Sequence, residues 1–199
     1  MSMSKPVIIS IEGNIGCGKS TLIQNIEKNF GKKYKGFKYV YLREPVGLWE
    51  SVVSKSGKNI LQKFYKDPNK YAYSFQTLVY LSFYKQLKGA INDSDNNTVI
   101  ICERSMDSCK GVFAKMLYDQ GKIENVCYQI YLNWFDEFAK EYPVNNLIYV
   151  KATPDTCYNR MHLRSRQGEE VIPLNYLKEC DNYHNEFIRN TPGTTHDMV

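Results

Sequence analysis

The sequence predicts an α/β fold in which a central parallel sheet is covered by helices on both faces. Two observations lead to this class: apolar strand-like runs alternate with helical stretches, and a Gly-rich phosphate-binding motif follows the first run directly. A length of 199 residues suits a single domain, because about 100 to 200 residues bury an adequate core. We therefore expect one domain over residues 1–199.

Four short apolar runs predict the strands of this sheet. They cover residues 7–11, 39–42, 99–102 and 147–150. Longer stretches carry the spacing of amphipathic helices and cover residues 69–91, 105–120, 123–141, 155–166 and 174–189. Thr153 and Pro154 give one of these helices a capping residue and a first-turn proline. The tail 190–199 has no apolar period, and we expect it to be disordered.

The residues after the first run, from Gly13 to Ser20, fit the pattern G-x-x-x-x-G-K-[ST]. Backbone N–H groups of such a loop converge on nucleotide phosphates, Lys19 reaches the β and γ oxygens, and the Ser20 hydroxyl ligates Mg²⁺. A Gly-rich turn without a ligand is the alternative. The flanking strand and helix favour a P-loop NTPase-type three-layer sandwich. The expected phosphate-binding residues are Gly13, Asn14, Ile15, Gly16, Cys17, Gly18, Lys19, Ser20 and Thr21.

Charged residues follow the second and third predicted strands, at the carboxyl edge where open α/β sheets bind ligands. Glu44 could accept the proton of an attacking hydroxyl, and Arg104 could brace Glu44 or a transferred phosphate. Glu103 follows four apolar residues and resembles the second magnesium-binding element of P-loop enzymes. The alternatives are a Glu44 that only complements a helix dipole and a Glu103–Arg104 surface ion pair.

Arg160, Arg164 and Arg166 lie on one predicted helix, with the first two on the same face. Such a cluster predicts a helical lid over about residues 160–172. Cations that close over the β and γ phosphates stabilise the charge of phosphoryl transfer and exclude water. A solvated basic helix face is the alternative.

Composition indicates where the protein resides more clearly than what it does. A net charge of +5, with 26 basic and 21 acidic residues interspersed, suits small acidic molecules as well as nucleic acid. The six cysteines form no C-x-x-C pair, which indicates reduced thiols and argues against a zinc site. Met1 to Pro6 leave no room for a signal or transit peptide, and no apolar run approaches the ~20 residues of a membrane span. We expect a cytoplasmic protein without a membrane partner.

The chain resembles the deoxyribonucleoside kinase family, which includes deoxycytidine, deoxyguanosine and mitochondrial-type thymidine kinases and the insect multisubstrate enzyme. The likeness runs from about residue 7 to about residue 188. Its marks are residues 11–16 of the P-loop, 44–46 with Trp49, Tyr65, 74–77, 103–105, and 152–154 leading into 160–173. The resemblance implies Mg²⁺- and ATP-dependent phosphorylation of the 5′-hydroxyl of deoxyribonucleosides. It also implies a homodimer and no nucleic-acid partner.

The resemblance assigns roles at the reacting centre and around the base. Glu44 would be the general base on the 5′-hydroxyl, with Arg104 beside it near the acceptor phosphate, and Ser20 and Glu103 would serve magnesium. Gln76 would pair with the Watson–Crick edge of the base, for which an amide has the necessary donor and acceptor. The base would stack on Phe113, between walls formed by Trp49 and Phe75. Core packing is the alternative for these aromatic residues.

The resemblance also assigns the sugar site and suggests a base preference. Tyr65 and Glu169 match the pair that holds the 3′-hydroxyl. Purine- and deoxycytidine-accepting members place an Arg and an Asp at positions that match Phe83 and Cys109. An apolar Phe83 and a small Cys109 are closer to the Met and Ala of thymidine-accepting members. We therefore expect a preference for pyrimidines such as thymidine and deoxycytidine.

One departure and three rival functions remain open. Family members usually add a fifth strand and a loop that contacts the adenine of ATP after residues 174–189, and that strand is expected to be missing here. A catalytically impaired, nucleoside-binding form is therefore one alternative. Thymidylate kinase shares the P-loop, the Arg-Glu-Pro turn and the lid. A GTPase-type switch would need an N-K-x-D guanine reader, which the sequence lacks.

Overall fold

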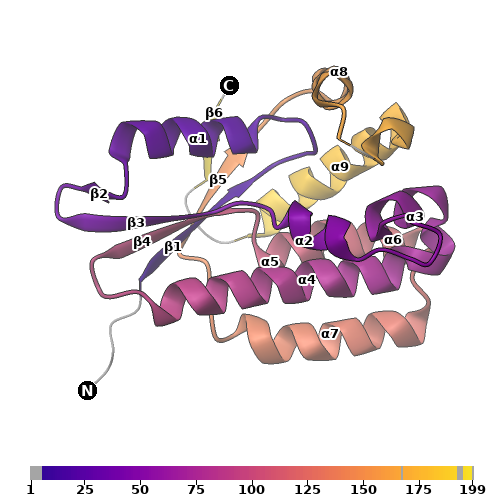
Figure 1. The fold of residues 1–199 in the computed structure, drawn as a ribbon, viewed down its shortest axis with the longest axis horizontal. Helices are drawn as coiled ribbons and strands as arrows, with labels where there is room; N and C mark the ends of the chain where they lie inside the picture. The colour runs from indigo at the N-terminus through magenta and orange to yellow at the C-terminus, as the bar shows by residue number, and fades with distance from the viewer. Residues whose placement is uncertain (1–5, 167, 192–194, 199) are drawn as a thin grey trace.

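The computed structural model describes residues 6–166, 168–191 and 195–198. Within them, six strands form one sheet in the order β2-β3-β4-β1-β5-β6 (Figure 1). The strands are β1 (Val7–Glu12), β2 (Lys33–Tyr34), β3 (Phe37–Leu42), β4 (Thr98–Glu103), β5 (Asn146–Val150) and β6 (Thr195–Met198). Every neighbouring pair is parallel except β2 with β3, which form a hairpin. The four predicted strands and the predicted α/β class are confirmed.

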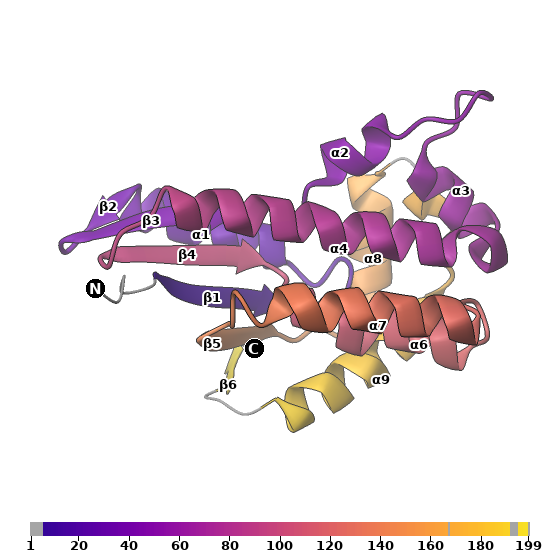
Figure 2. The same ribbon diagram turned by 90° about the horizontal axis from the view of Figure 1, so that it is seen from below.

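Helices cover both faces of the sheet. They are α1 (Lys19–Phe30), α2 (Val46–Ser51), α3 (Ile60–Lys66), α4 (Pro68–Asn92), α5 (Met106–Ser108), the π-helical η1 (Cys109–Ala114), α6 (Lys115–Asp119), α7 (Asn125–Ala139), α8 (Pro154–Arg164), the 3₁₀ turn η2 (Glu169–Val171) and α9 (Leu174–Asn190). The helix α1 lies on one face, and α4 and α7 run side by side across the other (Figures 1 and 2). The expected three layers are therefore present.

Local sequence explains where two of these helices begin. The side chain of Asp67 accepts from the backbone N–H of Lys70, and Pro68 follows as the first residue of α4. The hydroxyl of Thr153 accepts from the backbone N–H of Thr156 ahead of α8. Both caps satisfy N–H groups that a helix start leaves without an intrahelical partner.

The end of the chain differs from the prediction. The strand β6 pairs in parallel with β5, from Leu147 opposite Thr195 to Val150 opposite Met198. The expected disorder of the tail and the expected absence of a final strand were therefore wrong for residues 195–198. The edge of β5 offers a row of backbone donors and acceptors, and pairing satisfies them. Residues 192–194 and 199 lie outside the described part of the chain.

Two predicted helices also differ in detail. The helix expected over residues 105–120 contains the π-helical segment η1, which changes the spacing of its side chains. The helix expected over residues 155–166 ends at Arg164, because Ser165 adopts a left-handed conformation with φ of 51°. Arg166 consequently lies on a turn after α8 and not on the helix with Arg160 and Arg164.

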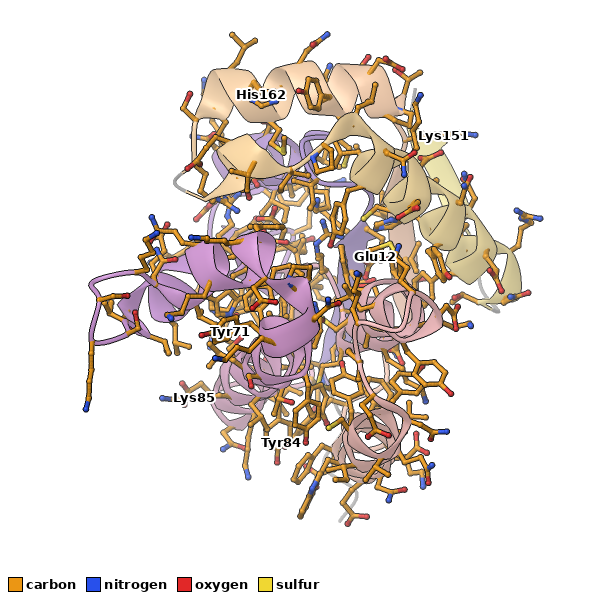
Figure 3. The ribbon with its side chains drawn as sticks, turned by 90° about the vertical axis from the view of Figure 1, so that its right-hand side faces the viewer. Glu12, Tyr71, Tyr84, Lys85, Lys151 and His162 are labelled. Carbon is orange, nitrogen blue, oxygen red and sulfur yellow. The ribbon has the colours of Figure 1, made fainter. Side chains whose placement is uncertain are left out.

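Because β1, β3 and β4 are parallel, their carboxyl ends lie at the same edge of the sheet. Ile11 and Ile100 are fully buried at the centre of the sheet, as expected for strands covered on both faces. Glu12 ends β1 in the interior of the molecule, whereas His162 lies on the peripheral helix α8 (Figure 3). Among the helices of the described residues, none combines the length and apolar character needed to cross a bilayer.

Candidate active site

The predicted phosphate loop connects β1 to α1 and depends on its glycines. Gly13 and Gly16 have φ of 143° and 79°, and a Cβ on either would collide with a backbone carbonyl, of Val150 and Cys157 respectively. Gly18 caps α1 without a side-chain hydrogen bond, so the first N–H groups of this 12-residue helix are available to an anion. The local geometry is that of a phosphate cradle.

A cavity of about 670 Å³ opens over this loop. Its walls include Ile15, Gly16, Gly18, Lys19, Ser20 and Thr21 from the predicted phosphate-binding set. Three residues of that set do not line the cavity: Gly13, Asn14 and Cys17. Their carbonyl oxygens accept hydrogen bonds from basic side chains that do line it. Arg104 donates to Gly13, Lys19 Nζ donates to Asn14 over 2.9 Å, and Arg160 donates to Cys17 over 3.1 Å.

The three lid arginines all line the same cavity. Arg164 donates to one carboxylate oxygen of Glu169, and Arg166 Nη1 donates to the other over 3.0 Å. Arg166 also lies 3.8 Å from Oε2 of Glu44. Arg166, on the turn after α8, is thus the lid arginine that contacts both Glu169 and the predicted base Glu44.

The predicted magnesium ligands face each other across the loop. Ser20 Oγ donates to Oε1 of Glu103 over 2.5 Å. A hydroxyl and a carboxylate oxygen suit Mg²⁺, which keeps several waters and takes few protein ligands. Among the described residues, no group of three or more His, Cys, Asp or Glu side chains could hold a metal ion. A magnesium ion here would therefore need phosphate or water oxygens as well.

Glu44 and Arg104 meet at the floor of the cavity. Arg104 Nε donates to Oε1 of Glu44 over 2.6 Å, and both residues line the cavity. Burial raises the pKa of Glu44, but the charges of Arg104 and Lys19 outweigh it and lower that pKa to about 2. Glu44 is therefore ionised at neutral pH and able to accept a proton.

Arg104 is held in a costly backbone conformation. Its φ is 70°, in the left-handed region that side chains disfavour by roughly 1–2 kcal/mol. Its N–H donates to the carbonyl of Ile11 over 3.0 Å, which continues the ladder between β4 and β1. Strain of this kind persists where surrounding contacts fix the residue, and it is common at functional sites.

A second, smaller cavity of about 60 Å³ lies beside the first. Every residue predicted to bind the nucleoside lines it: Glu44, Trp49, Tyr65, Phe75, Gln76, Phe83, Arg104, Cys109, Phe113 and Glu169. Trp49 packs edge-on against Phe75, with ring centroids 5.8 Å apart, and lies 6.2 Å from Phe83. The segment η1 contributes Cys109 and Phe113.

Two polar details of this pocket bear on its chemistry. Oε1 of Gln76 is buried and has no hydrogen-bond partner within the described part of the chain, which is unusual for a buried amide. The indole N–H of Trp49 donates to Ser82 Oγ over 2.9 Å, so that the ring is fixed. Burial and the charge of Glu169 raise the pKa of Tyr65, whose hydroxyl therefore stays protonated.

The two cavities share one wall. Ile15, Glu44, Arg104, Arg166 and Glu169 line both. A ligand in the small pocket and a phosphate in the large one would therefore meet at the Glu44 carboxylate. This arrangement suits transfer of a phosphoryl group to a hydroxyl of the bound molecule.

Sequence reasoning missed several pocket residues. Leu61, Phe64, Val79 and Tyr176 line the small cavity as well. Phe64 stacks on Phe75 with a centroid distance of 4.8 Å, and Tyr176 lies edge-on to Tyr65 at 6.4 Å. The N-x-x-Q capping box of Asn59 and Gln62 was a readable sign of α3, which carries Leu61 and Phe64.

Comparisons with known proteins agree with this geometry. A family model described as deoxynucleoside kinase matches residues 9–198. A probable deoxycytidine kinase of fowlpox virus (strain NVSL) is 37% identical over 183 residues, covering 90% of this chain and 71% of the viral protein. The deoxycytidine kinase of Mus musculus is 34% identical over 200 residues, with coverages of 90% and 74%. The mitochondrial deoxyguanosine kinase of Xenopus laevis is 28% identical over 197 residues, with coverages of 90% and 72%.

Proposed function

The chain belongs to the deoxynucleoside kinase family, and from this premise we propose that it transfers the γ-phosphoryl group of ATP to the 5′-hydroxyl of a deoxynucleoside. The observation that carries the proposal is the wall shared by the phosphate cavity and the small pocket. Glu44 and Arg104 stand in that wall, within reach of both ligands. A nucleoside and a triphosphate bound side by side would therefore react there.

The proposed transfer uses the oxygen of Glu44 that Arg104 does not bind. Oε1 is occupied by Arg104, so Oε2 accepts the proton of the 5′-hydroxyl. The hydroxyl oxygen forms a bond to the γ phosphorus, and the bond from that phosphorus to the bridging oxygen of ADP breaks. Arg104 and the three lid arginines neutralise the charge of the group in transit.

Magnesium and ATP are part of the proposal. When bound, Mg²⁺ would neutralise charge on the β and γ phosphates, and the Ser20 and Glu103 oxygens would hold it. Lys19 and the first N–H groups of α1 would hold the phosphates themselves. The acceptor would be a nucleoside because Tyr65 and Glu169 line the small pocket and could hold a sugar hydroxyl between them.

We further propose that pyrimidines such as thymidine and deoxycytidine are preferred. Gln76 can offer its amide donor and acceptor to several bases, so the walls must select among them. Phe83 and Cys109 are buried, carry no charge and line a cavity of only about 60 Å³. A small, apolar pocket favours a single-ring base, and it leaves purine edges without charged partners.

The proposed function is tested by ADP release from Mg·ATP with each of the four deoxynucleosides and with thymidine monophosphate. Turnover on a nucleoside above the Lys19→Ala blank supports the kinase, and the ranking of kcat/KM tests the base preference. Turnover on the monophosphate alone would mean a thymidylate kinase. Nucleoside binding without turnover would mean an impaired, nucleoside-binding form.

A homodimer is proposed from an exposed apolar surface on α7. Val126, Ile130 and Trp134 follow one another at four-residue steps and are 59%, 42% and 57% exposed. Leu81 of the adjacent α4 is 44% exposed. Contiguous apolar surfaces of this kind mark interaction sites. Light scattering should give twice the chain mass and Trp134→Glu should halve it, whereas Leu163→Glu, at an exposed apolar residue of α8, should leave the mass unchanged.

A reducing compartment such as the cytoplasm is proposed from the cysteines. All six are free thiols, and five of them are buried. Proteins of oxidising compartments commonly pair their cysteines. Fluorescence of a tagged copy in the native cell would test this location, and accumulation in an oxidising compartment would contradict it.

A further inference from the structure

His184 is a buried histidine to which the proposed transfer gives no role. It lies on α9, has 0% exposure, and packs edge-on against Phe113 with a centroid distance of 5.6 Å. Tyr149 lies on another side, nearly parallel at 6.4 Å. A polar ring buried this completely requires hydrogen-bond partners. Both of its nitrogens have one.

The two partners determine where the proton of the imidazole lies. Nδ1 is 2.6 Å from the carbonyl oxygen of Cys180, which can only accept, so Nδ1 carries the hydrogen. Nε2 is 3.2 Å from Nη1 of Arg104, which can only donate, and the Gly13 carbonyl also lies near the ring. Because a neutral ring carries one proton and that proton lies on Nδ1, Nε2 presents its lone pair to Arg104. Burial and the charge of Arg104 also hold the pKa of His184 well below its usual value, so the ring is neutral.

The remaining contacts of Arg104 show which groups depend on its bond to Nε2 of His184. Nε donates to Glu44, and Nη1 divides its two hydrogens between the Gly13 carbonyl at 2.7 Å and His184. The face of the guanidinium lies over the ring of Phe113, 4.6 Å from its centroid. Within the described residues Nη2 makes no hydrogen bond, so its two hydrogens are available to a ligand of the cavity that Arg104 lines.

We propose that His184 is a positioning residue for phosphoryl transfer, which holds Nη1 of Arg104 so that Nε keeps Glu44 in place and Nη2 faces the transferred group. The proposal rests on the proposed function. It links α9 to the reacting centre across 80 positions of the chain. Without this acceptor, one buried N–H of Arg104 loses its partner, and only the bonds to Glu44 and Gly13 and the ring of Phe113 hold the guanidinium.

Simple core filling is the rival explanation. A phenylalanine would fill the space between Phe113 and Tyr149 equally well, but it would offer no lone pair to Arg104. Replacing His184 by glutamine or by asparagine distinguishes a positioning role from core filling. His184→Gln can place its carbonyl oxygen near the position of Nε2, whereas His184→Asn is too short for this and keeps only a donor near Nδ1.

The test compares kcat and nucleoside KM in wild type, His184→Gln, His184→Asn and His184→Phe. We expect His184→Gln to retain kcat within about threefold, and His184→Asn and His184→Phe to lose at least tenfold with KM changed less than threefold. Equal kcat in the folded Gln and Asn variants would overturn the proposal. Phe187→Ala, one turn further along α9, controls for a loosened helix and should lower Tm with kcat within twofold.

A second readout does not depend on activity. Nitrogen-15 NMR of labelled histidines at pH 7, with His184 assigned by its loss in His184→Gln, reports which nitrogen carries the proton. A neutral ring protonated at Nδ1 is expected, and a ring protonated at Nε2 would overturn the proposal. If wild type turns over no nucleoside, the proposed function fails, and the NMR result still decides whether His184 can accept from Arg104.

Discussion

Arg104 Nε lies 2.6 Å from Oε1 of Glu44, and the pair they form is buried in the wall between the two cavities. The same guanidinium is bonded to Gly13 in the phosphate loop and to His184 in α9. Three separate segments of the chain therefore fix one carboxylate. Its other oxygen, Oε2, which Arg166 approaches to 3.8 Å, is the atom on which catalysis is expected to depend.

Glu44→Gln should abolish most turnover while preserving nucleoside binding. The amide keeps the size and one acceptor of the carboxylate but cannot take a proton as readily, so kcat should fall by about 10²–10⁴-fold. Initial rates of ADP release at saturating nucleoside measure this. Glu27→Gln is the matched control and should leave kcat unchanged, because Glu27 lies on α1 and pairs as a half-exposed side chain with Arg43. Near-normal kcat in Glu44→Gln would exclude Glu44 as the base.

Glu103→Gln should weaken the response to magnesium more than the response to nucleoside. Loss of one charged oxygen beside Ser20 leaves a poorer ligand for Mg²⁺, so the Mg²⁺ concentration for half-maximal rate should rise at least about tenfold. Titrating Mg²⁺ at fixed ATP measures it, and KM for the nucleoside should change little. An unchanged titration would remove Glu103 from the magnesium site.

The central strands of the sheet could be predicted from the sequence, whereas its edge strands β2 and β6 could not. Strands β1 and β4 are buried on both faces and therefore appear as continuous apolar runs. The strands β2 and β6 have two and four residues, and their place depends on the neighbour they pair with. The pairing of β6 with β5 joins residues far apart in the chain, and β2 is too short to show an alternation of its own, so neither strand leaves a period in the sequence.

The same distinction applies to the site. Glu44 and Arg104 could be predicted because each follows an apolar strand directly, where parallel sheets place their ligands. His184 could not, since a lone histidine on an amphipathic helix carries no signal of its own. Its contact with Arg104 exists only because α9 folds back against η1 and the end of β4.

Glu12 and Glu44 should respond to acid in opposite directions. The folded-state pKa of Glu44 is lowered to about 2, so its stabilising contribution is present above pH 4.5 and is lost as pH falls towards 2. Burial raises the pKa of Glu12, and the Ser105 hydroxyl and the charge of Arg104 only partly offset this. Its charged form therefore destabilises the fold as pH rises above 4.5.

Urea unfolding at pH 3, 5 and 8 measures both effects. Glu12→Gln should be more stable than wild type at pH 8, with the advantage shrinking at lower pH. Glu44→Gln should be less stable than wild type at pH 8, with the deficit shrinking by pH 3. A pH-independent difference for either variant would contradict the assigned pKa direction of that residue.

Phe83→Ala should widen the acceptance of bases. Removing this ring enlarges a cavity of about 60 Å³ and withdraws a contact from Trp49. The ratio of kcat/KM for deoxyadenosine to that for thymidine should rise at least about tenfold, the size of a few lost apolar contacts. Leu87→Ala is the matched control, since Leu87 is buried on the next turn of α4 at 6% exposure, against 7% for Phe83, and does not line the pocket.

Both alanine variants should lose about 2–5 kcal/mol of stability, so Tm alone cannot separate them. Only Phe83→Ala should change the base ratio, because only Phe83 bounds the space that the base would occupy. A similar ratio change in Leu87→Ala would mean that helix packing, and not the ring of Phe83, sets the preference. An unchanged ratio in Phe83→Ala would mean that the second ring of a purine is excluded elsewhere, with Cys109 and Phe113 as the next walls to vary.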